Sequence, residues 1–160
     1  MKKYLISFLV ISFIALITII ATINYKNNKF NICHSDILWI KENGTSDGIV
    51  MKSRVSLLIS NDYTGRMNIY GYIKENNVFY RLDRAVYFTY QAIDNKNNYS
   101  IHFNSLSVSA ADSTPQKLFA NFIQLEEDKI NYYINVTKMN DNIYIVKDEA
   151  YSSFTCYSDK

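Results

Sequence analysis

The sequence predicts a mainly β protein, in which an N-terminal transmembrane helix precedes a small antiparallel β-barrel domain with one short helix. Three observations lead to this prediction: an uncharged run of 20 residues near the N-terminus, period-two alternation of apolar and polar residues beyond it, and 14 Tyr beside one Pro and four Gly. Tyr, Ile, Val and Phe suit the half-buried surface of a sheet. The predicted organisation is residues 1–23 as cytoplasmic tip and membrane helix, 24–31 as stalk, and 32–160 as the β-rich domain.

The run Tyr4–Ile23 carries no charge and is long enough to cross a hydrocarbon core of about 30 Å. The alternative is a cleaved signal peptide, whose apolar region normally spans about 7–15 residues and ends in a small-x-small site. The exit at residues 21–25 offers no good cleavage pair, and Cys33 lies too far along for a lipoprotein. An uncleaved anchor is therefore the better prediction.

Lysines flank this helix on both sides, so the positive-inside rule alone does not orient it. Only three residues precede Tyr4, and an N-terminus in the cytoplasm leaves both Cys residues outside, where a disulfide persists. We therefore expect a single-pass protein of a bacterial inner membrane with its C-terminal domain in the periplasm.

Period-two alternation is typical of antiparallel strands with one buried face. It is clearest in three segments, Arg66–Lys74, Tyr80–Ile93 and Lys129–Lys138, and further strands are expected at 32–41, 49–60, 99–110, 142–147 and 152–157. The apolar phase shifts inside 99–110, which predicts a β-bulge near residues 104–105. About eight short strands favour a closed or nearly closed barrel, because closure hides sheet edges, with a sandwich as the alternative.

One segment, residues 112–123, departs from the alternation and predicts a short helix. Ser113 or Thr114 can cap it, and Pro115 suits its first turn. Its apolar residues would form one face, either closing one end of the barrel or serving as a lid or docking face.

The two Cys residues lie near the two ends of the β domain. A bridge between Cys33 and Cys156 is expected from the even count outside the membrane, with two free buried thiols as the alternative. No CxxC or HxxxH spacing gathers metal ligands, so we expect no metal site and no cofactor.

The charge and the motifs point away from catalysis and from nucleic acid. Removal of Lys2 and Lys3 from 17 basic residues leaves 15, against 15 acidic ones, so the exterior domain lacks a basic footprint. No GxSxG, HExxH or GxxxxGK[ST] occurs, and a hydrolase using His34 or His102 is only a minor alternative. Arg81, Asp83 and Arg84 could pair with one another on one strand.

The abundant Tyr residues either decorate an ordinary barrel or form a binding surface, which favours side chains with an apolar body and a polar tip. The candidates for a partner or ligand surface are aromatic and apolar residues of two strands and the predicted helix: Tyr70, Tyr72, Phe88, Tyr90, Leu118, Phe119 and Phe122.

The layout of the chain resembles the FidL-like family of inner-membrane proteins. The resemblance rests on a Lys-flanked N-terminal helix, a Cys just after the stalk, the segment Asp112-x-x-Pro115-x-x-Leu118-Phe119, and the ending Phe154-Thr155-Cys156. None of these positions is a catalytic motif. The family is in turn distantly similar to the ToxS and VtrC type of accessory protein.

The resemblance implies a function in signalling. Such proteins accompany a membrane-bound winged-helix transcriptional regulator, and some form a lipocalin-like barrel that receives an amphipathic ligand. We therefore expect a non-enzymatic accessory or sensor protein whose partners are that regulator, the bilayer through Tyr4–Ile23, and an amphipathic small molecule, without direct contact with nucleic acid. A structural or envelope-assembly protein without a signalling role is the alternative.

Overall fold

The computed structural model describes residues 11–20, 32–41, 48–123, 131–148 and 153–158. The chain divides into two compact units, residues 1–30 and 31–160. Residues 11–20 of the first unit are helical, and the predicted span Tyr4–Ile23 extends beyond the described residues on both sides. Neither described helix has both the length and the apolar character needed to cross a bilayer.

The second unit consists of eight strands and one helix in a simple order. They are β1 (Ile32–Lys41), β2 (Ile49–Ile59), β3 (Thr64–Glu75), β4 (Val78–Ala92), β5 (Asn98–Val108), α2 (Gln116–Ile123), β6 (Asn131–Asn140), β7 (Ile143–Asp148) and β8 (Ser153–Ser158). Each predicted strand lies within two residues of one of these strands at both ends. In most of them the alternation of apolar and polar residues follows the alternation of burial.

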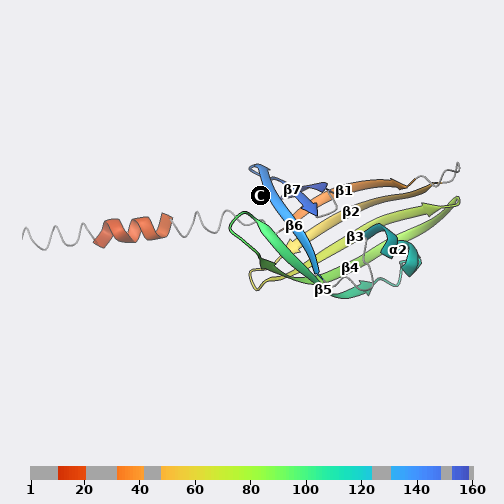
Figure 1. Ribbon diagram of the computed structural model, residues 1–160, viewed down its shortest axis with the longest axis horizontal. Coiled ribbons are helices and arrows are strands. Elements are labelled where there is room, and N and C mark those ends of the chain that lie inside the picture. The colour runs from red at the N-terminus through yellow and green to blue at the C-terminus, as the bar shows by residue number, and fades with distance from the viewer. Residues whose placement is uncertain (1–10, 21–31, 42–47, 124–130, 149–152, 159–160) are drawn as a thin grey trace, which may run out of the picture. The chain divides into compact units, whose positions relative to one another are not determined.

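The eight strands form a closed antiparallel barrel in which neighbours in sequence are neighbours in the sheet (Figure 1). β1 closes the barrel against β8 through only two residue pairs, Cys33 with Ser158 and His34 with Tyr157. The prediction of a closed barrel is confirmed, and the sandwich alternative is excluded.

The predicted bulge lies where the apolar phase shifts. Tyr87 of β4 faces Ser105, whereas the next residue, Phe88, faces Phe103, so Asn104 is the extra residue of β5. The bulge keeps Phe103 and Leu106 partly buried against the same core although their positions differ in parity.

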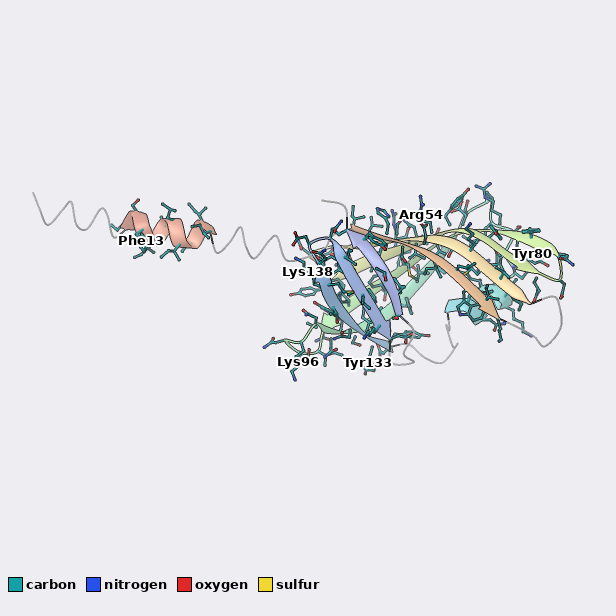
Figure 2. The ribbon with its side chains drawn as sticks, turned by 90° about the horizontal axis from the view of Figure 1, so that it is seen from above. Phe13, Arg54, Tyr80, Lys96, Tyr133 and Lys138 are labelled. Carbon is teal, nitrogen blue, oxygen red and sulfur yellow. A yellow bond between two sulfur atoms is a disulfide. The ribbon has the colours of Figure 1, made fainter. Side chains whose placement is uncertain are left out.

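Helix α2 fills the part of the barrel that the short strands do not cover. Figures 1 and 2 show β6–β8 gathered at one end of the long strands β1–β4, and α2 against the other end. Pro115 precedes the helix, and its carbonyl oxygen accepts from the N–H of Phe119 at 3.0 Å. The core around the helix consists of Ile49, Met51, Val55, Ile69, Ile73, Leu82, Val86, Leu118, Phe119 and Phe122. The helix therefore packs into the core, which agrees with the predicted role of closing one end of the barrel.

Gly71 of β3 lies at a close approach between two strands. A Cβ atom there would overlap the carbonyl oxygen of Lys52 and the Cα of Ser53 on β2, the strand to which Gly71 is paired. Only glycine fits this contact without moving the backbone of β2.

Candidate functional site

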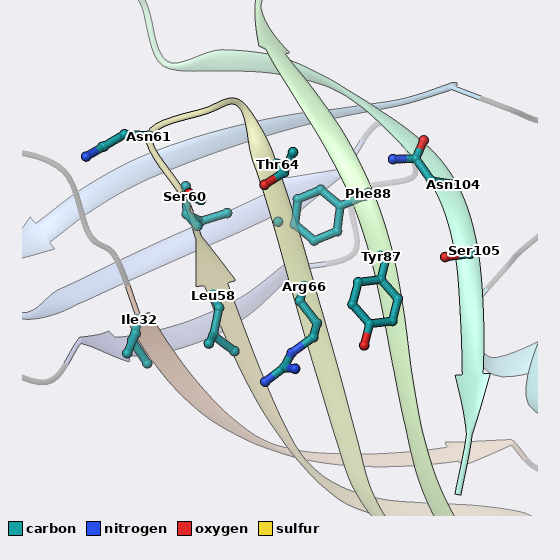
Figure 3. Close-up of a pocket in the computed structure, with 12 residues that line it drawn as sticks. Ile32, Leu58, Ser60, Asn61, Thr64, Arg66, Tyr87, Phe88, Asn104 and Ser105 are labelled. Atoms are coloured by element: carbon teal, nitrogen blue, oxygen red, sulfur yellow. The ribbon is translucent and has the colours of Figure 1, made fainter.

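A groove of about 800 Å³ crosses the outer face of β2–β5 beside the bulge (Figure 3). Its lining combines apolar and polar side chains, with Ile32, Leu58, Ile59, Tyr87 and Phe88 in the first group and Ser60, Asn61, Thr64, Asn104 and Ser105 in the second. The volume lies in the range of about 300–1,000 Å³ found for small-molecule sites.

One row of residues runs along the groove across four strands. The register sets Leu58 opposite Arg66, Arg66 opposite Tyr87, and Tyr87 opposite Ser105. Directly opposed side chains of an antiparallel pair lie about 5 Å apart on the same face. Arg66 is exposed and stands between an aliphatic and an aromatic side chain (Figure 3). Among the described residues of the lining, it is the one that carries a charge. An apolar wall with a central guanidinium suits an amphipathic molecule that carries an anionic group.

The groove ends at the turn between β2 and β3, which several hydrogen bonds hold in place. Asp62 accepts from the backbone N–H of Thr64 at 3.1 Å and from its hydroxyl at 2.6 Å, and these bonds lower the pKa of the Asp62 carboxyl. The hydroxyl of Tyr90 donates to the carbonyl oxygen of Ser60 at 2.8 Å, and burial raises the pKa of this phenol. Tyr63 completes the turn with a left-handed backbone, φ 64°.

The floor of the groove depends on a glycine. Gly65 of β3 faces Phe88 of β4, and a Cβ atom on Gly65 would overlap the ring of Phe88. The ring is 2% exposed and lies with its centroid 6.4 Å from that of Phe103. Glycine therefore lets an aromatic ring seal the barrel interior beneath the groove.

A second polar cluster is buried between β4 and the segment that leads into α2. The guanidinium of Arg84 donates to both carboxylate oxygens of Asp112, at 3.0 Å each, and to Oε1 of Gln116 at 2.7 Å. It also donates to the carbonyl oxygen of Thr114 and lies 4.4 Å from the ring centroid of Phe119. The side chains of Arg84 and Asp112 are only 3% and 2% exposed, so this pair is a buried ion pair.

The carboxylate of Asp112 also organises the backbone around it. It accepts from the N–H of Asp83 at 2.8 Å and from the N–H of Thr114 at 2.9 Å. Burial by itself raises the pKa of Asp112, but these bonds and those from Arg84 outweigh burial and lower it. The expected pairing among residues 81–84 is wrong for Arg84, because its side chain points into the barrel and meets Asp112. The cluster fixes the start of α2, which is a structural role.

The predicted disulfide is confirmed. Cys33 of β1 and Cys156 of β8 are bonded, with 5.4 Å between their Cα atoms, and they lie 123 positions apart in the sequence. Both side chains are buried, at 0% and 1% exposure. A cavity of about 330 Å³ lies near this seam, where Nδ1 of His34 is 2.9 Å from the hydroxyl oxygen of Ser56.

The structure does not bring the seven candidate surface residues together. Tyr70 and Tyr72 lie on the outer face of β3, 57% and 37% exposed, and Tyr90 is half-buried beside the β2–β3 turn. The other four residues lie in the core: Phe88, Leu118, Phe119 and Phe122 are each at most 9% exposed. Their apolar periodicity reflects core packing, because the three residues of α2 lie in the barrel core and Phe88 contributes only the floor of the groove.

His102 lies on β5, with its Nδ1 3.2 Å from the side-chain oxygen of Asn131. Among the described parts of the chain, no three His, Cys, Asp or Glu side chains gather as they would around a metal ion. The groove and its row through Arg66 were missed by sequence reasoning, because their residues come together only through the register of four strands.

Comparison with known proteins identifies the family of the chain. No curated protein matches the chain. The family described as "FidL-like putative membrane protein" matches residues 71–156, which is more than half of the 160 residues. The matched part runs from within β3 to Cys156 and includes both Arg84 and Asp112. The chain therefore belongs to the FidL-like membrane protein family.

Proposed function

We propose that the protein is an accessory or sensor subunit that associates with a membrane-bound winged-helix transcriptional regulator and stabilises or modulates it. The anchor would be Tyr4–Ile23, a single span with the N-terminus in the cytoplasm. Membership in a family of membrane proteins supports the anchor. The buried disulfide Cys33–Cys156 supports a periplasmic barrel, because such bonds persist in oxidising compartments.

The groove on the outer face is the observation that carries a binding function. Buried side chains from the strands and α2 form the core, so we place the ligand in the groove and not in the lumen of a lipocalin-like barrel. The carboxylate or another anionic group of an amphipathic ligand would meet Arg66, while its apolar part would cover Leu58 and Tyr87.

Octanoate is a suitable first probe, because it combines one carboxylate with a short apolar chain. We expect the full chain in nanodiscs to bind it, measured by saturation-transfer NMR against empty nanodiscs. Arg66→Gln should weaken binding about fivefold, since an ion pair at an exposed site contributes at most about 1 kcal/mol. Arg81→Gln is the matched control, because Arg81 is also exposed on the outer face but does not line the groove. Equal binding by wild type and Arg66→Gln would refute the assignment of the groove.

The association with a regulator is tested by deleting the gene for this protein. We expect the level or the transcriptional output of the membrane-bound winged-helix regulator to change, and restoration of the wild-type gene to reverse the change. An unchanged regulator together with a defect in envelope assembly would favour the structural alternative and refute the proposal.

A further inference from the structure

Strand β1 is paired on both sides over only a small part of its length. It pairs with β2 from Ile32 to Lys41, whereas its ladder with β8 stops at His34. From Ser35 to Lys41, no other described strand pairs with the second side of β1. Alternate residues of this stretch therefore direct backbone N–H and C=O groups towards a side where another strand can bind.

The side chains on this open stretch are apolar on both faces. Leu38 and Ile40 point outward and are 64% and 58% exposed. Ile37 and Trp39 point inward and are only half-buried. The centroid of the Trp39 ring lies 4.5 Å from the centroid of the Phe122 ring in α2. Soluble domains usually protect such an edge with Pro, a bulge or inward charges, because it templates pairing with other strands. The ladder of β1 with β2 shows no bulge, and Ile37–Ile40 contains no Pro or charge.

We propose that an extended segment of a different protein chain adds to β1 as a further strand along Ile37–Ile40. This inference rests on the proposed function and specifies how the partner binds. The added segment would carry apolar residues at the four positions that face this run, and an acidic residue opposite Lys41. Its main chain would satisfy the open edge, and its inward side chains would cover Trp39 beside α2.

A second copy of this chain fits the edge poorly. Residues that face each other in an antiparallel pair point to the same side of the sheet, so a two-fold axis must pass through a residue. A two-fold axis at Ile37 sets Asp36 against Leu38 of the second copy. An axis at Leu38 sets Asp36 against Ile40 of the second copy. An axis at Trp39 sets Lys41 against Ile37 of the second copy. Each register buries an apolar side chain against a charge, which favours a partner of different sequence.

The test is photo-crosslinking in the native membrane, with the full chain carrying a photoreactive amino acid in turn at positions Asp36, Leu38 and Ile40. Fragment mass spectra then map the captured residues. We expect the three sites to capture a single segment of one other protein. The residues captured from successive sites should lie two positions apart and should run in one direction along that segment. Tyr70 is the control site, because it is 57% exposed on the same outer face but its strand is paired on both sides.

A charged variant gives an independent measurement. The double change Leu38→Lys and Ile40→Lys should lower capture at position 36 about tenfold or more, since two large apolar contacts are lost. Tyr70→Lys should leave that capture nearly unchanged. Both variants alter exposed side chains, and circular dichroism will show whether the barrel remains folded.

Each outcome separates this inference from the proposed function. Capture of the regulator at Tyr70 but not at the β1 sites would overturn strand addition and leave the proposed function standing. Capture of β1 of a second copy would overturn the choice of a different chain. No capture at any of the four sites would overturn strand addition, while the response of the regulator to gene deletion decides the proposed function separately.

Discussion

Replacement of Asp112 by alanine would leave the guanidinium of Arg84 buried without its carboxylate. Removal of one partner from a buried ion pair typically costs about 3–5 kcal/mol. The N–H groups of Asp83 and Thr114 would also lose their acceptor. Each N–H group that stays buried without a new acceptor costs about 1–3 kcal/mol. Against this, Arg84 keeps the side chain of Gln116 and the ring of Phe119. We expect a total loss near the lower ends of these ranges, about 5 kcal/mol, which is a large part of the roughly 5–15 kcal/mol of a typical domain.

The assay is urea unfolding of the full chain in detergent, followed by fluorescence of Trp39, the single Trp, which packs on α2 through Phe122. The matched control is Asp36→Ala. Asp36 also receives two hydrogen bonds from one arginine, Arg54, but that pair is exposed, with 68% and 73% of the two side chains accessible. We expect no measurable change in the control. Equal free energies of unfolding for the two variants would refute the reasoning, because burial is the difference between the two pairs.

Three further predictions concern pH, the disulfide and a glycine. The pKa of Asp112 is lowered in the folded protein, so the stability that its carboxylate contributes is complete above the unfolded pKa of about 3.9. This contribution is lost as the pH falls towards and through the folded pKa. Acid titration should therefore lower the free energy of unfolding of wild type more than that of Asp112→Asn. Cys156→Ser opens a loop of 123 residues and should cost about 4–5 kcal/mol in urea unfolding, matched by reduction of wild type; an unchanged midpoint would contradict this. Gly71→Ala should cost about 1–3 kcal/mol, because its Cβ overlaps the backbone of β2, and a midpoint equal to wild type would show that β2 can move.

Local signals in the sequence predict the strands and the helix well. The segment 49–60 and β2 differ by a single residue, because buried and exposed positions alternate there with apolar and polar residues, as in the pair Met51 and Lys52. The change of apolar parity predicts the bulge at Asn104, since an extra residue is the simplest way to keep both halves of β5 on the core. Pro115 marks the start of α2, because its ring fixes φ and its missing N–H costs nothing before the first turn.

Features that depend on register were beyond such reasoning. Arg84 and Asp112 are 28 residues apart, and they meet because the segment after β5 continues along β4, where the N–H of Ser109 donates to the carbonyl oxygen of Asp83 at 3.0 Å. The row Leu58–Arg66–Tyr87 likewise requires the pairing of three strands. The apolar candidates of α2 were read as a surface because amphipathic periodicity is the same for a helix that docks outward and one that packs inward.

The seam between β1 and β8 connects the disulfide with the open edge. Every other ladder of the barrel has at least five residue pairs, whereas this one has two, beside the bond between Cys33 and Cys156. Continuation of β8 along β1 in the same register would set Phe154 against Ile37, but it would set Ser153 against the exposed Leu38. Such a pair would bury little apolar area, since serine covers only a small part of the leucine side chain. The covalent bond therefore closes the barrel where pairing is short, and β8, which begins at Ser153, would in this register reach no further along β1 than Leu38. An apolar strand from another chain would complement the open stretch of β1, which is why we place the partner there.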